Sequence, residues 1–152
     1  MPPRIADESI LRFVDALAWN WLIAGTDAHA KNYSLLLPVG SGPRLAPLYD
    51  VSTVLPWPSV VQYLAQNIAG KKHKPGDVGA LQWDAIAATV GYRPADVRKR
   101  VQELVDRFVA GRVDVAAAVK AMPGSIAGYV EQAASLIEEN ALRIAGRLRK
   151  AP

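Results

Sequence analysis

Apolar positions recur at helical spacing in the first part of the chain. The spacing predicts a helix from Glu8 to Ala24, with Asp7 or Ser9 as its cap and Gly25 where a helix usually stops. Its apolar positions are Ile10, Phe13, Val14, Leu17, Trp21 and Leu22. This helix leads directly into a polar loop, residues 25–32.

Helical spacing also dominates the second half of the chain. The predicted helices are Gly79–Val90 ended by Gly91, Pro94–Ala110 ended by Gly111, a short helix over Val113–Met122, and a last helix capped by Ser125 and reaching Arg149. The apolar stripe of the last helix is nearly heptad but only about three heptads long, so we expect it to pack onto the domain rather than form a coiled coil.

Two short apolar runs flank a turn rich in proline, glycine and serine. Residues 33–37 and 44–48 are therefore predicted to form a small β-hairpin, which Tyr49 and Asp50 close.

The segment 51–79 has no regular spacing, because Pro56 and Pro58 interrupt it. Residues 70–76, with the sequence GKKHKPG, are predicted to form a solvated basic loop. The predicted fold class is therefore mainly α, with one small β-hairpin next to the polar loop, in a single domain over residues 1–152.

The composition is that of a globular protein and excludes cysteine chemistry. The 152 residues are 51% hydrophobic and 21% charged, and the absence of cysteine excludes disulfides, cysteine–zinc sites and thiol catalysis. The net charge of +4 comes without a helix-turn-helix signature, so direct nucleic-acid binding is not expected. No apolar run reaches the roughly 18 residues of a membrane span and no signal peptide is evident, so we expect a cytoplasmic protein.

The polar loop carries the residues suited to chemistry. Asp27 and Asn32 have the D-x-x-x-x-N spacing of a kinase catalytic loop, and Asp50 follows the hairpin, where the metal-binding Asp of a kinase falls. Phosphoryl transfer needs a carboxylate that orients and deprotonates the attacking hydroxyl, and oxygen ligands for magnesium. Asn32 and Asp50 supply such oxygens, and Lys31 could neutralise charge on the transferred phosphoryl group.

Each of these residues also has a purely structural explanation. Asp27 could be a turn or cap residue, His29 a hydrogen-bonded loop histidine, and Asn32 a residue that tolerates a left-handed turn. Lys31 could be solvated, and Asp50 could end a strand. The D-x-x-x-x-N spacing alone arises often by chance, so the interpretation as a site depends on the order of helix, loop, hairpin and second carboxylate.

The stretch NWLIAGTDAHAKNYS, residues 20–34, and the stretch LAPLYDV, residues 45–51, closely resemble the C-terminal domain of the HipA-like serine/threonine kinase toxins. Weaker similarity continues in residues 69–71 and 139–148. The resemblance implies the helical C-lobe of a protein-kinase-like fold, ATP and magnesium as cofactors, and transfer of the ATP γ-phosphoryl group to Ser or Thr of a protein. It also implies a toxin of a bacterial type II toxin–antitoxin pair, bound by a HipB-type antitoxin and tied to persistence.

The resemblance assigns a role to each loop residue. Asp27 would be the catalytic base, and Asn32 and Asp50 the magnesium ligands. His29 would shape the loop, and Lys31 would contact phosphate. Common protein kinases have a lysine where His29 stands, and D-x-H-x-x-N also occurs in small-molecule phosphotransferases such as the aminoglycoside kinases, which remain an alternative.

The sequence lacks the N-lobe of a complete kinase. No G-x-G-x-x-G occurs, and only 26 residues precede Asp27. Three explanations stay open: a truncated inactive remnant, a split kinase with its N-lobe on another chain, or a fragment of a longer protein. Because phosphoryl transfer depends mostly on positioning, we expect the isolated chain to have little or no kinase activity.

The alternative functional class is a protein-binding module. A C-lobe without its partner exposes the face that meets the N-lobe, and it could bind an N-lobe chain or an antitoxin. Trp19, Trp21 and Trp57 are candidates for apolar surface on that face, although core packing is the default for tryptophan.

Overall fold

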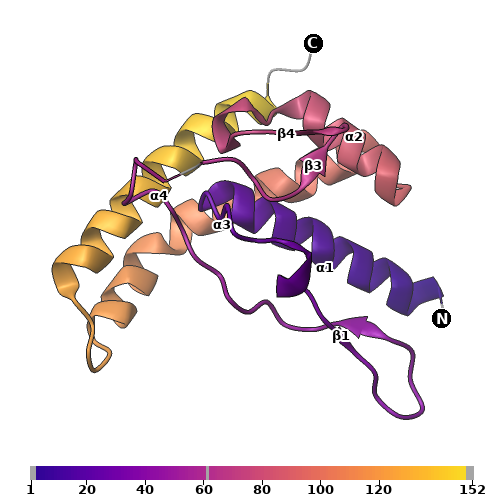
Figure 1. Cartoon of the computed structure of the whole chain (residues 1–152), viewed down its shortest axis with the longest axis horizontal. Coiled ribbons are helices and arrows are strands. Elements are labelled where there is room, and N and C mark those ends of the chain that lie inside the picture. Colours follow the sequence, from indigo (N-terminus) through magenta and orange to yellow (C-terminus); the bar gives the residue numbers. More distant parts are fainter. Residues whose placement is uncertain (1–2, 61, 150–152) are drawn as a thin grey trace.

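Four helices make up most of the computed structural model, which describes residues 3–60 and 62–149 (Figure 1). Their bounds are α1 Pro3–Leu22, α2 Ala80–Val90, α3 Pro94–Lys120 and α4 Ala127–Leu148. Short elements connect α1 to α2: the 3₁₀ turn η1 Ala30–Asn32, strands β1 Leu35–Leu36 and β2 Arg44–Leu45, strands β3 Asn67–Ile68 and β4 Lys71–Lys72, and the 3₁₀ turn η2 Pro75–Asp77. The predicted mainly α fold class is confirmed, with a second hairpin in addition to the one expected.

The core lies where the four helices meet. Its largest fully buried side chains are Val14, Trp21, Leu22, Val78, Trp83, Val97, Val101, Val105 and Ile144. The three valines of α3 are spaced by four residues and therefore form one stripe. Trp21 packs edge-on against Trp83 with 5.4 Å between ring centroids, and its Nε1 donates to the Pro75 carbonyl at 2.8 Å. The end of α1 is thereby held inside the core, directly before the polar loop.

The helix boundaries agree with the sequence patterns except at the start of α1 and in α3. The first helix begins at Pro3, so the predicted caps Asp7 and Ser9 are wrong: both lie inside α1, which ends at Leu22. Helix α2 ends before the left-handed Gly91, as predicted. The prediction that Gly111 ends a helix is wrong: α3 runs through Gly111 to Lys120 and includes most of the predicted short helix. An interior glycine costs a helix only about 1 kcal/mol, which the flanking helix formers and the packing on α4 outweigh.

The last part of α3 and the first part of α4 project from the core as a helical pair (Figure 1). The cap of α4 is Ile126, so the predicted cap Ser125 is wrong; the Ser125 hydroxyl has no hydrogen-bond partner. An apolar groove of about 590 Å³ lies between these two helices and α1. Trp19 and Phe108 meet edge-on in this groove, with 5.9 Å between ring centroids.

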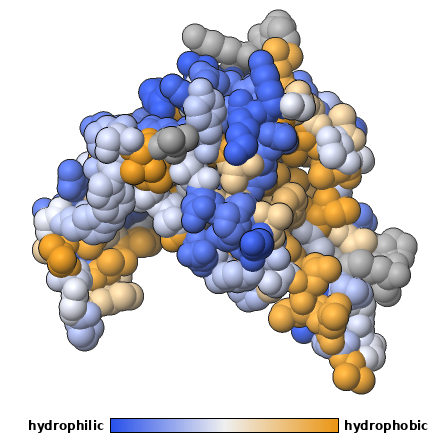
Figure 2. All heavy atoms as spheres, viewed as in Figure 1, coloured by the Kyte–Doolittle hydropathy of each residue, from blue (hydrophilic) through white to orange (hydrophobic). Residues whose placement is uncertain are grey.

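The three tryptophans proposed as exposed surface have different environments. Trp21 is 1% exposed, in agreement with core packing, and Trp19 is partly buried against the core. Trp57 is 48% exposed and lies 5.9 Å from the Tyr129 ring. Figure 2 shows further hydrophobic surface at the end of the β1–β2 hairpin, where Leu37 and Val39 are exposed. No helix in the described part of the chain is both long and apolar enough to cross a membrane.

The predicted hairpin is present but short. Leu35 pairs with Leu45 and Leu36 with Arg44, in antiparallel register.

The second hairpin lies in the segment 51–79, which has no regular spacing of apolar residues. Asn67 pairs with Lys72 and Ile68 with Lys71. The prediction of a fully solvated basic loop is therefore partly wrong: the two lysines are exposed, but His73 is only 5% exposed. A buried ring nitrogen needs a partner, and His73 Nε2 lies 3.1 Å from the Ile68 carbonyl.

Candidate functional site

The polar loop begins in a tightly packed bend at the end of α1. Ala24 adopts a left-handed conformation with φ 53°, and its carbonyl accepts a hydrogen bond from the Val54 amide at 3.4 Å. A Cβ on Gly25 would lie 2.5 Å from Asn20 Oδ1 and 3.2 Å from the Ser52 carbonyl oxygen. Glycine is therefore required here for space, because the loop passes between α1 and the segment after Asp50.

Asn32 is the centre of the loop. It is only 6% exposed, and its Nδ2 donates to the Asp27 carbonyl at 3.2 Å and to Asp50 Oδ2 at 3.0 Å. The η1 turn places the side chain there, since the Asn32 amide bonds to the His29 carbonyl at 3.0 Å. One amide group thus brings together the three residues singled out by spacing, although Asp50 is distant in sequence.

Asp50 is held by its neighbour Tyr49. The Tyr49 hydroxyl donates to the Lys31 carbonyl at 2.8 Å and lies 2.7 Å from Ser34 Oγ. Asp50 itself has φ 55°, in the left-handed region that Asp tolerates better than most residues. The end of the hairpin is therefore tied to the loop at two points, through the Tyr49 hydroxyl and through the Asp50 carboxylate.

Asp27 and His29 lie at the surface of the loop. Their side chains are 72% and 50% exposed, and Asp27 Oδ1 lies 3.9 Å from His29 Nε2. An exposed carboxylate is accessible to a substrate hydroxyl, which a general base requires. The Lys31 side chain is also exposed, and its ammonium group belongs to none of the ion pairs in the described part of the chain.

The loop is supported from behind by three side chains that the sequence analysis did not single out as site residues. The Tyr33 hydroxyl accepts hydrogen bonds from Asn20 Nδ2 at 3.2 Å and Gln66 Nε2 at 3.3 Å, and Gln66 Nε2 also donates to the Ala28 carbonyl. Burial raises the pKa of the Tyr33 phenol above its ordinary value. The one signal in the sequence was Asn20, a polar residue beside the apolar face of a helix; nothing marked Gln66.

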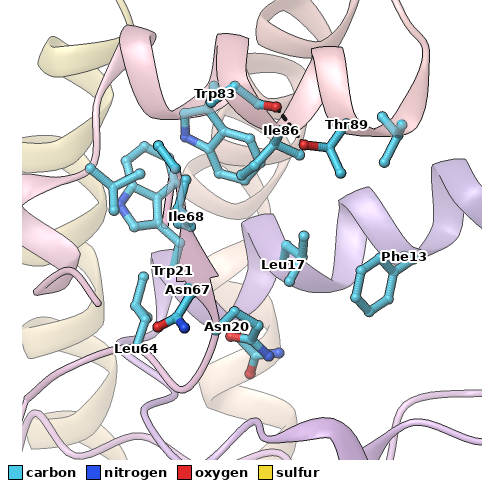
Figure 3. Close-up of a pocket in the computed structure, with 15 residues that line it drawn as sticks. Phe13, Leu17, Asn20, Trp21, Leu64, Asn67, Ile68, Trp83, Ile86 and Thr89 are labelled. Carbon is cyan, nitrogen blue, oxygen red and sulfur yellow. Dashed lines mark hydrogen bonds between the residues drawn. The ribbon is translucent and has the colours of Figure 1, made fainter. Parts of the chain in front are cut away.

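A cavity of about 190 Å³ lies next to this support, between α1, α2 and β3 (Figure 3). Figure 3 shows Trp21, Trp83 and Ile86 along one wall, and Phe13, Leu17 and Asn20 following α1. None of the five predicted site residues lines it. The cavity is therefore a feature of the packing behind the loop, separate from the cluster of Asp27, Asn32 and Asp50.

Asn32 and Asp50 carry oxygen atoms of the kind that could bind a magnesium ion. Magnesium takes carboxylate and carbonyl oxygens and commonly completes its shell with water and substrate phosphates. With Asn32 Nδ2 committed to hydrogen bonds, Asn32 Oδ1 and the Asp50 carboxylate are the oxygens available on the two side chains. The described residues contain no cluster of three or more His, Cys, Asp or Glu suited to a metal, so an ion here would take its further ligands from water or nucleotide oxygens.

The model of the HipA-like C-terminal domain matches residues 3–112 of this chain, which include the loop, the hairpin and Asp50. The chain belongs to the HipA-like C-terminal domain family. The resemblance seen in the loop and hairpin is thereby confirmed.

Curated proteins that are similar in sequence to this HipA-like domain are named as kinases. "Putative kinase Y4mE" of Sinorhizobium fredii is 34% identical over 97 residues, which are 64% of this chain and 23% of that protein. "Putative kinase Y4dM" of the same strain is 30% identical over 104 residues, 66% of this chain and 24% of that protein. A "Putative kinase" of Haemophilus influenzae is 36% identical over 44 residues, covering 29% of this chain and 13% of its own length. The chain thus spans about a quarter or less of the relatives it matches.

The fold is shared with a solved HipA structure. HipA of Shewanella oneidensis MR-1, determined with HipB and its operator DNA, superposes with a TM-score of 0.76 at 21% identity. The match covers 94% of this chain and 34% of that chain, so it includes helices beyond the part matched by the family model.

Proposed function

We propose that this chain supplies the catalytic loop of an ATP-dependent protein kinase of the HipA type, which transfers the γ-phosphoryl group to Ser or Thr of a protein. Asp27 would accept the proton of the attacking hydroxyl, and Asn32 and Asp50 would hold magnesium against the nucleotide phosphates. Lys31 would contact phosphate, and His29 would shape the loop. The observation that carries the proposal is the double hydrogen bond of Asn32 Nδ2, which joins the Asp27 backbone to the Asp50 carboxylate.

The biological context proposed is a cytoplasmic toxin–antitoxin pair. The structural neighbour is a HipA bound to HipB and operator DNA, which supports a HipB-type antitoxin as partner of this chain as well.

A second candidate function is a binding subunit that completes its site with a separate N-lobe. Leu35, Leu36 and Leu37 are 60%, 44% and 75% exposed and follow the catalytic loop directly. Consecutive exposed leucines favour burial against another surface. Such a split kinase would use the same Asp27, Asn32 and Asp50, so both candidates predict magnesium-dependent nucleotide binding.

Calorimetric titration with ATP and magnesium tests the site. We expect binding by the wild-type chain, loss of binding in Asp50→Ala, and retained binding in Asp27→Asn, since Asp27 is assigned to proton transfer and not to the metal. Asp114→Asn, an exposed carboxylate on α3, is the matched control and should bind like the wild type. Equal binding by wild type and Asp50→Ala, or no magnesium-dependent binding at all, would contradict the proposal.

A further inference from the structure

A polar pocket of about 220 Å³ lies between η2 and the C-terminal part of α4. Its lining includes three cations, Lys74, Arg143 and Arg147, and one carboxylate, Asp77. None of the four forms an ion pair within the described part of the chain. The side chains that line the pocket therefore sum to a net charge of +2, and the Lys74 ammonium also lies 5.6 Å from the centre of the Tyr63 ring.

Arg143 is held in place by a buried amide. Asn140 is only 3% exposed, and its Oδ1 accepts a hydrogen bond from Arg143 Nη2 at 2.6 Å. The Asn140 Nδ2 donates to the Leu22 carbonyl at 2.6 Å, so the network reaches the end of α1. A guanidinium fixed in this way can bind an anion without losing the full conformational entropy of a free arginine.

Gly76 provides the space that Arg143 occupies. A Cβ at this position would collide with Arg143 Nη1. Gly76 is not among the residues with positive φ, so backbone conformation does not explain the glycine. The turn is thus shaped to let the guanidinium lie against its backbone.

The helix dipole of α4 explains only one of the two arginines that α4 contributes to the pocket. A cation in the last turn of a helix is favoured by the exposed carbonyl groups, which explains Arg147. Arg143 lies one turn earlier, and two like charges spaced by four residues destabilise a helix. A bound anion would remove this repulsion.

We propose that this pocket binds a phosphate group. A phosphate monoester near neutral pH carries a charge close to −2, which matches the pocket, and its oxygens suit the fork of an arginine and the point charge of a lysine. The site uses none of the residues Asp27, Asn32 or Asp50, and it does not depend on the kinase proposal.

The test measures the affinity of the purified chain for O-phosphoserine, AMP and inorganic phosphate by calorimetry at constant ionic strength. We expect binding of at least one of them, weakened about tenfold or more in both Arg143→Gln and Arg147→Gln, because each removes a charge-assisted contact. Lys99→Gln, an exposed cation on α3, should bind like the wild type. The compound bound most tightly identifies the source of the phosphate: a phosphorylated side chain, a nucleotide or the free ion.

Arg147→Gln keeps the test decisive if Arg143→Gln disturbs the Asn140 network, since Arg147 makes no side-chain hydrogen bond within the described chain. Asp50→Ala should retain the binding, which separates this pocket from the nucleotide site. Affinity unchanged in Arg147→Gln, or no binding of any of the three compounds, would overturn the proposal.

Discussion

At the scale of single residues, Asn32 determines the geometry of the candidate site. Its amide nitrogen is a donor, and both acceptors lie on segments that the chain folds together: the Asp27 carbonyl and the Asp50 carboxylate. Burying the amide without these partners would lower the free energy of unfolding by about 1–3 kcal/mol. The buried position of Asn32 is therefore stable only when the loop and the hairpin are both folded.

The substitution Asn32→Asp tests this role. The variant loses the donor and places a second carboxylate beside Asp50, so we expect it to lower the free energy of unfolding by about 2–3 kcal/mol in the absence of divalent ions. Two carboxylates attract magnesium more strongly than a carboxylate and an amide, so magnesium should raise the melting temperature of the variant more than that of the wild type.

The matched control is Asn67→Asp, which makes the same chemical change on an exposed side chain of β3. It should be nearly neutral and insensitive to magnesium. If magnesium raised the melting temperatures of wild type and Asn32→Asp equally, the proposed pairing of positions 32 and 50 around a metal would be wrong.

The site residues that could be predicted from the sequence are those that lie close together along the chain or follow the order of loop, hairpin and second carboxylate seen in kinases. Asp27 and Asn32 share one loop, and Asp50 follows the hairpin that returns the chain to it. Gln66 could not be predicted, because its contact with Ala28 spans 38 residues of chain without a regular pattern. Long-range side-chain to backbone contacts of this kind depend on the packed fold and leave no periodic signal.

At the scale of elements, α3 shows that a glycine in the sequence does not by itself end a helix. Glycine ends α2 at position 91, where the backbone is left-handed with φ 76°, but Gly111 lies inside α3. The two glycines look alike in the sequence, and packing of α3 along α4 distinguishes them.

Replacing each glycine by alanine gives opposite expected effects. Gly111→Ala should stabilise the protein by about 0.5–1 kcal/mol, because alanine is the better helix former. No atom lies within 4 Å of the added Cβ at position 111. Gly91→Ala should destabilise it by about 1–2 kcal/mol, because an L-residue is strained in the left-handed region.

Urea denaturation of both variants measures the two effects. A destabilised Gly111→Ala would mean that α3 is interrupted at this residue, as the sequence pattern alone indicated.

At the scale of the whole molecule, α4 contributes buried side chains to the core although it lies outside the residues matched by the family model. The family model ends at residue 112, but Ala141, Ile144, Ala145 and Leu148 are buried against the rest of the core. Asn140 adds a polar connection, since it bonds the carbonyls of Trp21 and Leu22 at the end of α1. The polar loop therefore starts from a helix end that the last helix of the chain holds in place.

The last helix offers a matched pair of substitutions that tests its share of the stability. Ile144 is 0% exposed and Leu142 is 55% exposed, although they are two residues apart. Ile144→Ala should lower the free energy of unfolding by about 2–5 kcal/mol through lost burial and an added cavity, whereas Leu142→Ala should change it by less than about 0.5 kcal/mol. Near-equal effects in chemical denaturation would mean that α4 is not packed as described. Because α1 ends against α4, the destabilised Ile144→Ala should also bind ATP and magnesium more weakly than Leu142→Ala, which would connect the packing of the last helix to the geometry of the loop.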